Sequence, residues 1–571
     1  MLTSFRRADT LPVRRQRIST DSAIELHETV NPARWCITFA DLQFFQSEVR
    51  RAIQEGTFQE SFEASRGPSI YAVNENYIKP VTAAAGKMSW ALMMNPEGLD
   101  CDVFITHAWQ EDVFEFTEKV LTSWPWRANH AWCCMLANPQ NLDIGALLQS
   151  PSLSPFALAL KSSKYMLVVP NRHTSVYTRL WCGYEAYLAF QSNKIIQTAA
   201  PPIWRQVWLA WFMMLPALLI GLMVGSMSKV HHLEGAKQLM LLMRTLALLA
   251  SLVSQNCGQI RLCLIANHIG LASGAAAVME IAWSDPHDAL PLLPQNIDEQ
   301  ASTVWYTRVS MLAYFLLAEI DRLNWQTEIS ETEQLQNQFG GTIRQAACSQ
   351  VQDELNIRHE IGDQVDEVDK VIHVLLKAGL TSDALRDAHL QGVELEHAGV
   401  VQVAIPALVF GPHLLLNCSH FLLRLLLVCT QDERWTQAHW TPLHWFIAAV
   451  QTSSMVTRLC FLTLLVTSSI DERCFMLNAV AKTVAPMLFC LFLEIAALYR
   501  SLIFLYHLSF LVLLFFAALG IRGTLKLPCG LLVQFFLSRV VACSGEHESS
   551  HESPETCSES SRSSSLGSEL S

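Results

Sequence analysis

Charged residues are scarce in this chain of 571 residues. Asp, Glu, Lys and Arg make up 16% of it, against roughly 25% in a typical soluble domain, while hydrophobic residues make up 51%. This deficit indicates segments that lie in a membrane. The net charge is −12, and no stripe of Arg and Lys alternates with aromatic side chains, so the sequence predicts no nucleic-acid partner.

Several motifs are missing. None of the 16 cysteines forms a Cys-x-x-Cys pair, and Cys133 and Cys134 are adjacent, so neither a metal site nor a disulfide framework is predicted. There is no G-x-G-x-x-G or P-loop motif to hold phosphates. The first twenty residues are rich in Arg and lack the apolar run of a secretory signal, which favours a basic cytosolic tail over an organelle transit peptide.

An α/β domain is predicted over residues 66–200, after an N-terminal region (1–65) that is expected to be poorly ordered or helical. Helical patterns such as Glu111–Trp124 alternate there with short apolar runs. Runs of this length suit parallel strands that are covered on both faces, and their alternation with helices favours right-handed crossovers. The expected strands lie in Cys101–Trp109, His130–Ala137, Lys164–Pro170 and Asn193–Thr198.

Long apolar segments follow. Trp204–Met227 has a single charge, Arg205, at its edge, and about twenty such residues span a bilayer. A second span over Gln238–Val253 would complete a hairpin (204–256), although Arg244 opposes it. A dense apolar block predicts a four-helix transmembrane bundle over 401–521.

Two further regions are more polar. Residues 257–400 are expected to form a mainly soluble helical module, in which Val365, Val368, Ile372 and Leu375 have helical spacing. Leu262–Trp283 and Met311–Ile320 are apolar enough to add membrane contacts, so the number of spans stays open between four and seven. Residues 522–571 comprise a juxtamembrane segment and a Ser/Glu-rich tail that is expected to be disordered.

The stretch TRLWCGYEAYLAF, Thr178–Phe190, places one carboxylate in an apolar helix. Glu185 lies four residues after Trp181 and therefore on the same helix face. Ser175 is the expected N-cap of this helix. The helix starts near the carboxyl end of the preceding strand, where open α/β sheets bind ligands, so we expect Glu185 to be partly desolvated, with a perturbed pKa.

Two segments resemble Toll/interleukin-1 receptor (TIR) domains. They read DVFITH and YMLVVPNRHTSVYTRLWCGYEAYLA, and the resemblance covers about Cys101–Thr198. It implies a flavodoxin-like parallel sheet, a role in signalling and self-association through the domain. The wider arrangement resembles a group of multi-pass membrane proteins of protists. Arg179, Lys194 and Arg205 before the first span favour a cytoplasmic α/β domain by the positive-inside rule, as do the missing signal peptide and the many free cysteines, whereas Lys229 and Lys237 oppose it. The sequence does not identify the membrane.

The resemblance also implies a site. In TIR domains that hydrolyse NAD(+), the glutamate of the W-C-x-x-E segment is catalytic, and it matches Glu185. Thr106, His107, Trp109 and Trp181 would then bind NAD as a substrate, with no cofactor, and the loop Asn138–Asn141 would gate the cleft. Because nicotinamide leaves as a neutral molecule, a fixed carboxylate beside the oxocarbenium ion is sufficient.

Other interpretations remain open, so the sequence does not decide whether the chain is an enzyme. Many TIR domains only assemble with one another, here through loops around Asn138 and Asn171. A channel or transporter regulated by the domain would require Arg458, Lys482 and Glu494 to meet inside the bundle. This chain also departs from the TIR pattern, because the last predicted strand runs directly into an apolar helix.

Overall fold

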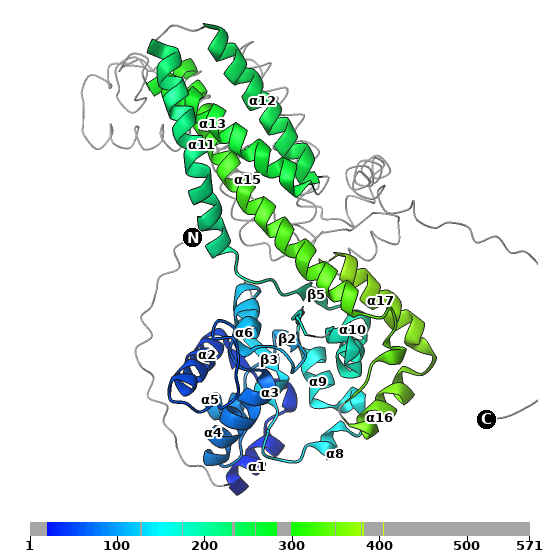
Figure 1. Ribbon diagram of the computed structural model, residues 1–571. Helices are drawn as coiled ribbons and strands as arrows, with labels where there is room; N and C mark the ends of the chain where they lie inside the picture. The colour runs from blue at the N-terminus through cyan, green and yellow to red at the C-terminus, as the bar shows by residue number, and fades with distance from the viewer. Residues whose placement is uncertain are drawn as a thin grey trace, which may run out of the picture.

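The computed structural model describes residues 20–381 except 126–127, 174, 231–233, 257–258, 283–298, 349 and 379, together with Ala404. Figure 1 shows an α/β domain from which long helices project on one side. The spans expected over 401–521, with Arg458, Lys482 and Glu494, and the tail over 522–571 lie outside the described residues.

A six-stranded sheet forms the centre of the α/β domain. Its strands have the order β1-β3-β2-β4-β5-β6, in which the four inner strands are parallel and the two edge strands antiparallel. The strands expected in the sequence are confirmed. The order reverses between β2 and β4, as at the switch point of doubly wound sheets. The strands are β1 (Ile37–Thr38), β2 (Val103–Thr106), β3 (His130–Cys133), β4 (Tyr165–Val168), β5 (Ile195–Thr198) and β6 (Leu380–Thr381).

Helices cover the sheet. Helix α2 packs on α6, and α10 packs on α9. The N-terminal part begins with α1 (Thr20–Thr29), η1 (Pro32–Arg34), α2 (Phe39–Gln54), α3 (Ile70–Val73), the π-helix η2 (Asn74–Ile78), α4 (Lys79–Ala84) and α5 (Trp90–Met94). It continues with α6 (Val113–Thr122), α7 (Cys134–Ala137), α8 (Gly145–Leu148), η3 (Pro151–Leu153), α9 (Pro155–Ser162), η4 (Val176–Thr178) and α10 (Leu180–Gln191).

Helix α2 shows that the core extends to the N-terminal side of residue 66. Thr38 and Asp41 form a capping box at its start: Asp41 N donates to Thr38 Oγ1 over 3.0 Å, and Thr38 N donates to Asp41 Oδ2 over 2.8 Å. Leu42, Phe45 and Val49 then lie on one face and are fully buried in the core of the sheet.

The α/β domain is discontinuous in sequence. After β5 the chain forms α11 (Trp204–Val230), α12 (Glu234–Asn256), α13 (Ile260–Ala282) and α15 (Glu299–Gln338). It then returns as η5 (Ile343–Gln345), α16 (Val351–Ile361), η6 (Gly362–Gln364), α17 (Val365–Ala378) and β6, which pairs antiparallel with β5. The described residues between 259 and 381 are thus divided between the projecting helices and the α/β domain.

The spacing that predicted a helix after residue 365 is confirmed. Val368, Ile372 and Leu375 of α17 are buried in the same core as the sheet, and α17 packs on α10. Together with β6 it covers the side of the domain next to β5, where the chain departs into α11.

Two of the projecting helices contain stretches that are long and apolar enough to cross a membrane. They are Trp204–Ser228 and Ile260–Glu280, with mean hydropathies of 2.2 and 1.6. The predicted second span, over 238–253, corresponds to the shorter apolar stretch Gln238–Ser251. Large apolar side chains of α11 point away from the protein, among them Trp208, Phe212 and Leu219, which are 62–67% exposed.

Glycines bring α11 and α13 into close contact. Gly221 and Gly225 are spaced as G-x-x-x-G, and their α-carbons face the backbone of Ala272 and Ala276. A Cβ atom at these positions would lie 2.1 Å and 2.4 Å from the carbonyl oxygens of Ala272 and Ala276. Small residues at this spacing allow helix backbones to approach within membranes.

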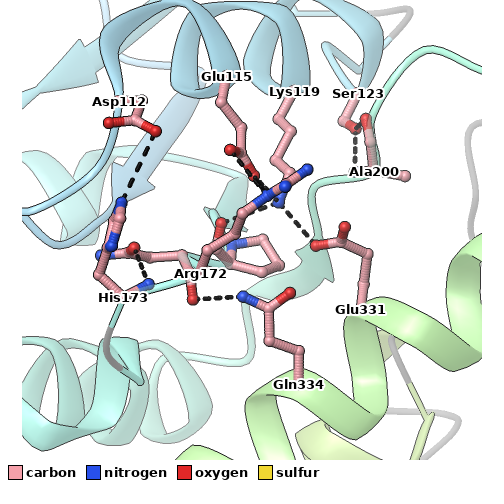
Figure 2. A network of polar contacts seen from close by, with 11 residues as sticks. Asp112, Glu115, Lys119, Ser123, Arg172, His173, Ala200, Glu331 and Gln334 are labelled. Atoms are coloured by element: carbon pink, nitrogen blue, oxygen red, sulfur yellow. Dashed lines mark hydrogen bonds and ion pairs between the residues drawn. The ribbon is translucent and has the colours of Figure 1, made fainter. Parts of the chain in front are cut away.

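A buried ion pair fixes α15 on the α/β domain (Figure 2). Lys119 Nζ of α6 lies 2.7 Å from Glu331 Oε2 of α15 and 3.2 Å from Glu115 Oε1, and it donates to Pro170 O over 3.0 Å. Its side chain is only 2% exposed. Gln334 Nε2 of α15 donates to Asn171 O over 2.6 Å. We call these contacts the α15 clamp.

We expect Gly225→Leu to lower the free energy of unfolding by about 1–3 kcal/mol, because a side chain there must push α13 away. The matched control is Met223→Leu, whose side chain is 56% exposed on the same helix. Thermal unfolding of the full chain in lipid nanodiscs measures both. Equal melting temperatures for the two variants would contradict the close helix contact.

We also expect Lys119→Met to destabilise the protein by about 3–5 kcal/mol, since it leaves Glu331 without its buried cation, whereas Glu115 keeps Arg172 as a partner. Arg344→Met is the control, because the ion pair of Arg344 with Asp366 is exposed and is worth less than about 1 kcal/mol. The measurement is again thermal unfolding, and a Lys119 variant as stable as the Arg344 variant would show that the clamp does not hold the two parts together.

Candidate functional site

A cavity of about 340 Å³ lies at the carboxyl ends of β2 and β3, beside α10. We call it the Glu185 cavity. It is of the size that suits part of a nucleotide. Its lining is aromatic on one side and polar on the other, and it includes the described residues Phe104, Thr106, His107, Trp109, Trp132, Cys134, Asn138, Gln140, Phe156, Arg179, Trp181, Cys182, Glu185, Gln350 and Asp353.

The five residues singled out in the sequence come together here. Thr106 ends β2 and His107 and Trp109 follow it, Trp181 and Glu185 lie on one face of α10, and all five line the cavity. Of the loops expected to make contacts, the one at Asn138 lines the cavity too. Asn171 lies elsewhere, in the α15 clamp.

Glu185 is a buried carboxyl group, with 5% of the residue exposed. Burial raises its pKa to about 7, against the opposing effects of the Thr106 hydroxyl and of the Arg179 guanidinium. No ion pair within 4 Å joins it to a described residue, and the ion pair of Arg172 is with Glu115 instead. The carboxyl group of Glu185 therefore titrates near neutral pH.

Besides His107 Nδ1, two buried polar atoms of the lining have no hydrogen-bond partner of regular geometry among the described residues. They are Thr106 Oγ1, in a residue that is 1% exposed, and Asn138 Oδ1, in a residue that is 5% exposed. Unpaired buried polar atoms are rare in native proteins because each costs about 1–3 kcal/mol. A ligand that donates hydrogen bonds would satisfy both.

His107 lines the cavity but is held inside the fold. Its Nε2 lies 3.2 Å from Cys134 Sγ and 3.6 Å from Cys133 Sγ, and its Nδ1 lies 3.8 Å from Glu111 Oε1. Burial, with a smaller contribution from Arg179, lowers the pKa of His107 to about 3, so the ring is neutral. Burial also raises the pKa of Glu111 well above its usual value. His107 thus supplies no positive charge to a ligand.

An aromatic wall lines one side of the cavity. Phe104 and Trp132 stack with ring centroids 5.2 Å apart, Trp132 meets Phe156 edge-on at 5.2 Å, and Phe156 stacks on Trp181 at 4.9 Å. Sequence analysis identified only Trp181 of these four. Such a wall offers flat rings a stacking surface.

The returning chain completes the cavity. Gln350 and Asp353 line it, and Asp353 Oδ2 accepts a hydrogen bond of 3.3 Å from Trp181 Nε1. Just before them, Ala347 pairs with the start of α10: Leu180 N donates to Ala347 O over 3.1 Å, and Ala347 N donates to Thr178 O over 3.0 Å. Sequence analysis missed both lining residues.

One local signal for this contact is Gly183, in the middle of α10. A Cβ atom there would lie 3.1 Å from Ile343 Cγ2 of η5, so glycine lets the returning chain approach closely. A glycine inside an otherwise apolar helix indicates such an approach, although it does not identify the segment that makes it.

The start of α10 differs from the prediction. Ser175 caps the short η4 turn, accepting a hydrogen bond from Tyr177 N over 3.3 Å, because that turn intervenes before α10. The N-cap residue of α10 is Arg179, which makes no side-chain capping bond. Arg179 is half-buried and lines the cavity.

Within the part of the chain that the structure describes, no group of three or more His, Cys, Asp or Glu side chains is placed to hold a metal ion. Comparison of the chain with models of protein families, with curated proteins and with solved structures finds no significant match.

The raised pKa of Glu185 predicts a pH-dependent stability. Because its folded pKa is near 7 and its unfolded pKa about 4.5, ionisation destabilises the fold progressively as the pH rises through this range. We expect Glu185→Gln to be more stable than the wild type by up to roughly 3 kcal/mol at pH 8, and the advantage to vanish below about pH 4.5. Thermal unfolding of both proteins between pH 4 and 8 checks this, and a pH-independent difference would contradict it.

Proposed function

We propose that this chain is a multi-pass membrane protein whose α/β domain is TIR-like and hydrolyses NAD(+) through Glu185. The observation that carries the proposal is a buried carboxyl group with a pKa near 7 in a cavity with an aromatic wall, at the carboxyl edge of a parallel sheet. Open α/β sheets bind ligands at this edge.

The chemistry needs few groups. The bond between C1′ of the ribose and N1 of the nicotinamide breaks, its electron pair leaves with N1, and neutral nicotinamide departs without a proton donor. The ionised Glu185 stabilises the positive charge that develops on the ribose. Water then attacks C1′ and releases one proton, giving ADP-ribose. Arg179 and Thr106 favour the ionised form of Glu185 that this step requires.

The aromatic wall and the unpaired polar atoms fit this substrate. The nicotinamide ring is flat and cationic, so rings such as Trp181 and Phe156 suit it. Asn138 Oδ1, which lacks a partner among the described residues, is an acceptor for the carboxamide N–H or for a ribose hydroxyl.

We further propose that α11 and α13 lie in a bilayer, with more spans beyond them. The exposed apolar surface of α11 and the close approach of its glycines to α13 support this. The α/β domain is then proposed to be cytoplasmic. Lys194 and Arg205 flank α11 on that side, as the positive-inside rule requires of a cytoplasmic domain. Arg179 lines the cavity and therefore does not count as a flanking charge.

A second candidate function is a non-enzymatic assembly module, which a surface feature favours. Leu153, Val351 and Leu355 are 57–75% exposed on neighbouring elements, η3 and α16. Exposed apolar side chains that gather in one place are typical of contact sites between proteins. Self-association through this surface is compatible with either function.

We expect the full chain in nanodiscs to release nicotinamide from NAD(+), and Glu185→Gln to slow this at least about a hundredfold because the charge is lost while the shape is kept. Glu118→Gln is the control, since Glu118 is exposed on α6 and pairs with Arg50. The full chain is required because Asp353 and Gln350 complete the cavity. Absence of release by folded protein, or release that survives Glu185→Gln, would refute the proposal.

A further inference from the structure

We infer that Arg179, at the start of α10, forms an anion subsite of the Glu185 cavity that binds a phosphate group attached to the ribose of the ligand. The inference rests on the proposed function and deepens it. It makes the substrate class a phosphorylated ribosyl pyridinium, that is, a mononucleotide or dinucleotide rather than a nucleoside.

The first observation is the isolation of the guanidinium. Arg179 lines the cavity and is half-buried, and although its backbone N donates to Val176 O, its guanidinium makes no hydrogen bond or ion pair with any residue that the structure describes. By contrast, Lys119 pairs with Glu331 and Arg358 with Glu354, and Lys194 donates to the Lys161 and Ser163 carbonyl oxygens. Burial disfavours the charge of Arg179, but the combined influence of Cys182, Cys134, Tyr71 and Glu185 outweighs it, so the pKa of the guanidinium is raised although no described carboxylate lies within ion-pair distance.

The second observation is independent of Arg179. Thr106 Oγ1 and Asn138 Oδ1 belong to residues that are more than nine-tenths buried, they line the same cavity, and they lack regular partners among the described residues. A cation and an amide oxygen on two different elements are therefore left for a ligand, and the Thr106 hydroxyl lies beside Glu185, whose ionised form it favours. Phosphate, ribose hydroxyls and a carboxamide are complementary to this set.

The electrostatics allow only one place for a phosphate. Arg179 is the only cation among the described lining residues, because His107 is neutral. The positive end of the α10 dipole reinforces it, since α10 is 12 residues long and begins at Leu180. Glu185 and Asp353 carry the negative charge of the lining, and Asp353 is occupied by Trp181 Nε1.

The spacing along α10 suits a phosphorylated ribose. Glu185 lies six residues after Arg179, which corresponds to a rise of about 9 Å along the helix. Because the arginine side chain is long, its guanidinium can bind the phosphate on the 5′ oxygen while Glu185 meets the other side of the same ribose. The flat ring then lies against the aromatic wall.

The test compares two ligands that differ by one phosphate: nicotinamide mononucleotide and nicotinamide riboside. Binding to the full-length Glu185→Gln variant in nanodiscs is measured by calorimetry, so that cleavage does not interfere. We expect the mononucleotide to bind about tenfold to a hundredfold more tightly, as for hydrogen bonds to a charged group. Adding Arg179→Gln should remove this preference and leave the affinity for the riboside unchanged.

Two further variants distinguish the charge of Arg179 from its planar shape and provide a control outside the cavity. Arg179→Lys, which retains the charge but loses the planar fork, should keep part of the preference. Arg344→Gln, which removes an exposed arginine outside the cavity, should keep all of it. Inorganic phosphate should compete with the mononucleotide in the presence of Arg179 and fail to compete with the riboside.

The outcomes separate the two claims. Equal binding of both ligands, or a preference that survives Arg179→Gln, overturns the anion subsite even if the full chain cleaves NAD(+). A preference that depends on Arg179, in a protein that releases no nicotinamide, supports the subsite and refutes the hydrolase. If neither ligand binds folded protein, the subsite is wrong.

Discussion

The fold depends on one buried ammonium group. Lys119 lies where α6, the loop after β4 and α15 meet, and its charge is stable there only because Glu331, Glu115 and the Pro170 carbonyl surround it. These contacts fix the position of α15 on the domain. The chain that follows α15 then meets the start of α10, where Ala347 pairs with Thr178 and Leu180. The wall of the Glu185 cavity thus depends on an ion pair outside the cavity.

Opposing effects within the cavity set the state of Glu185. Burial favours its neutral form, whereas Thr106 and Arg179 favour the ionised form, and the balance leaves the pKa near 7. The same burial removes the charge of His107, so the cavity keeps one unpaired cation and one carboxylate that can change its protonation. The arrangement sacrifices stability, since Glu185, Thr106 and Asn138 would all be easier to bury as apolar residues. A cost of this kind, concentrated in one cavity, is typical of functional sites.

Sequence reasoning correctly predicted the features that depend on residues close together in the sequence. The apolar runs located the four inner strands, and the four-residue spacing of Trp181 and Glu185 placed both in the cavity. It failed for lining residues that reach the cavity from a segment far away in the sequence. Asp353 lies in the first turn of the polar helix α16 and Gln350 is the N-cap residue before it, and neither belongs to a motif, so their role follows only from the return of the chain after α15. Ser175 was misassigned because a short turn, which has no periodicity to reveal it, separates it from α10.

The return of the chain also sets an order of events during synthesis. When β5 leaves the ribosome, its outer edge has no partner, because β6 follows only after α11, α12, α13 and α15. An unpaired strand edge is prone to aggregation and to binding by chaperones. The nascent domain must therefore wait with an open edge and an incomplete cavity until the long helices have been made. The lining of the cavity is complete only after α15 has been made, because Gln350 and Asp353 follow it in the chain.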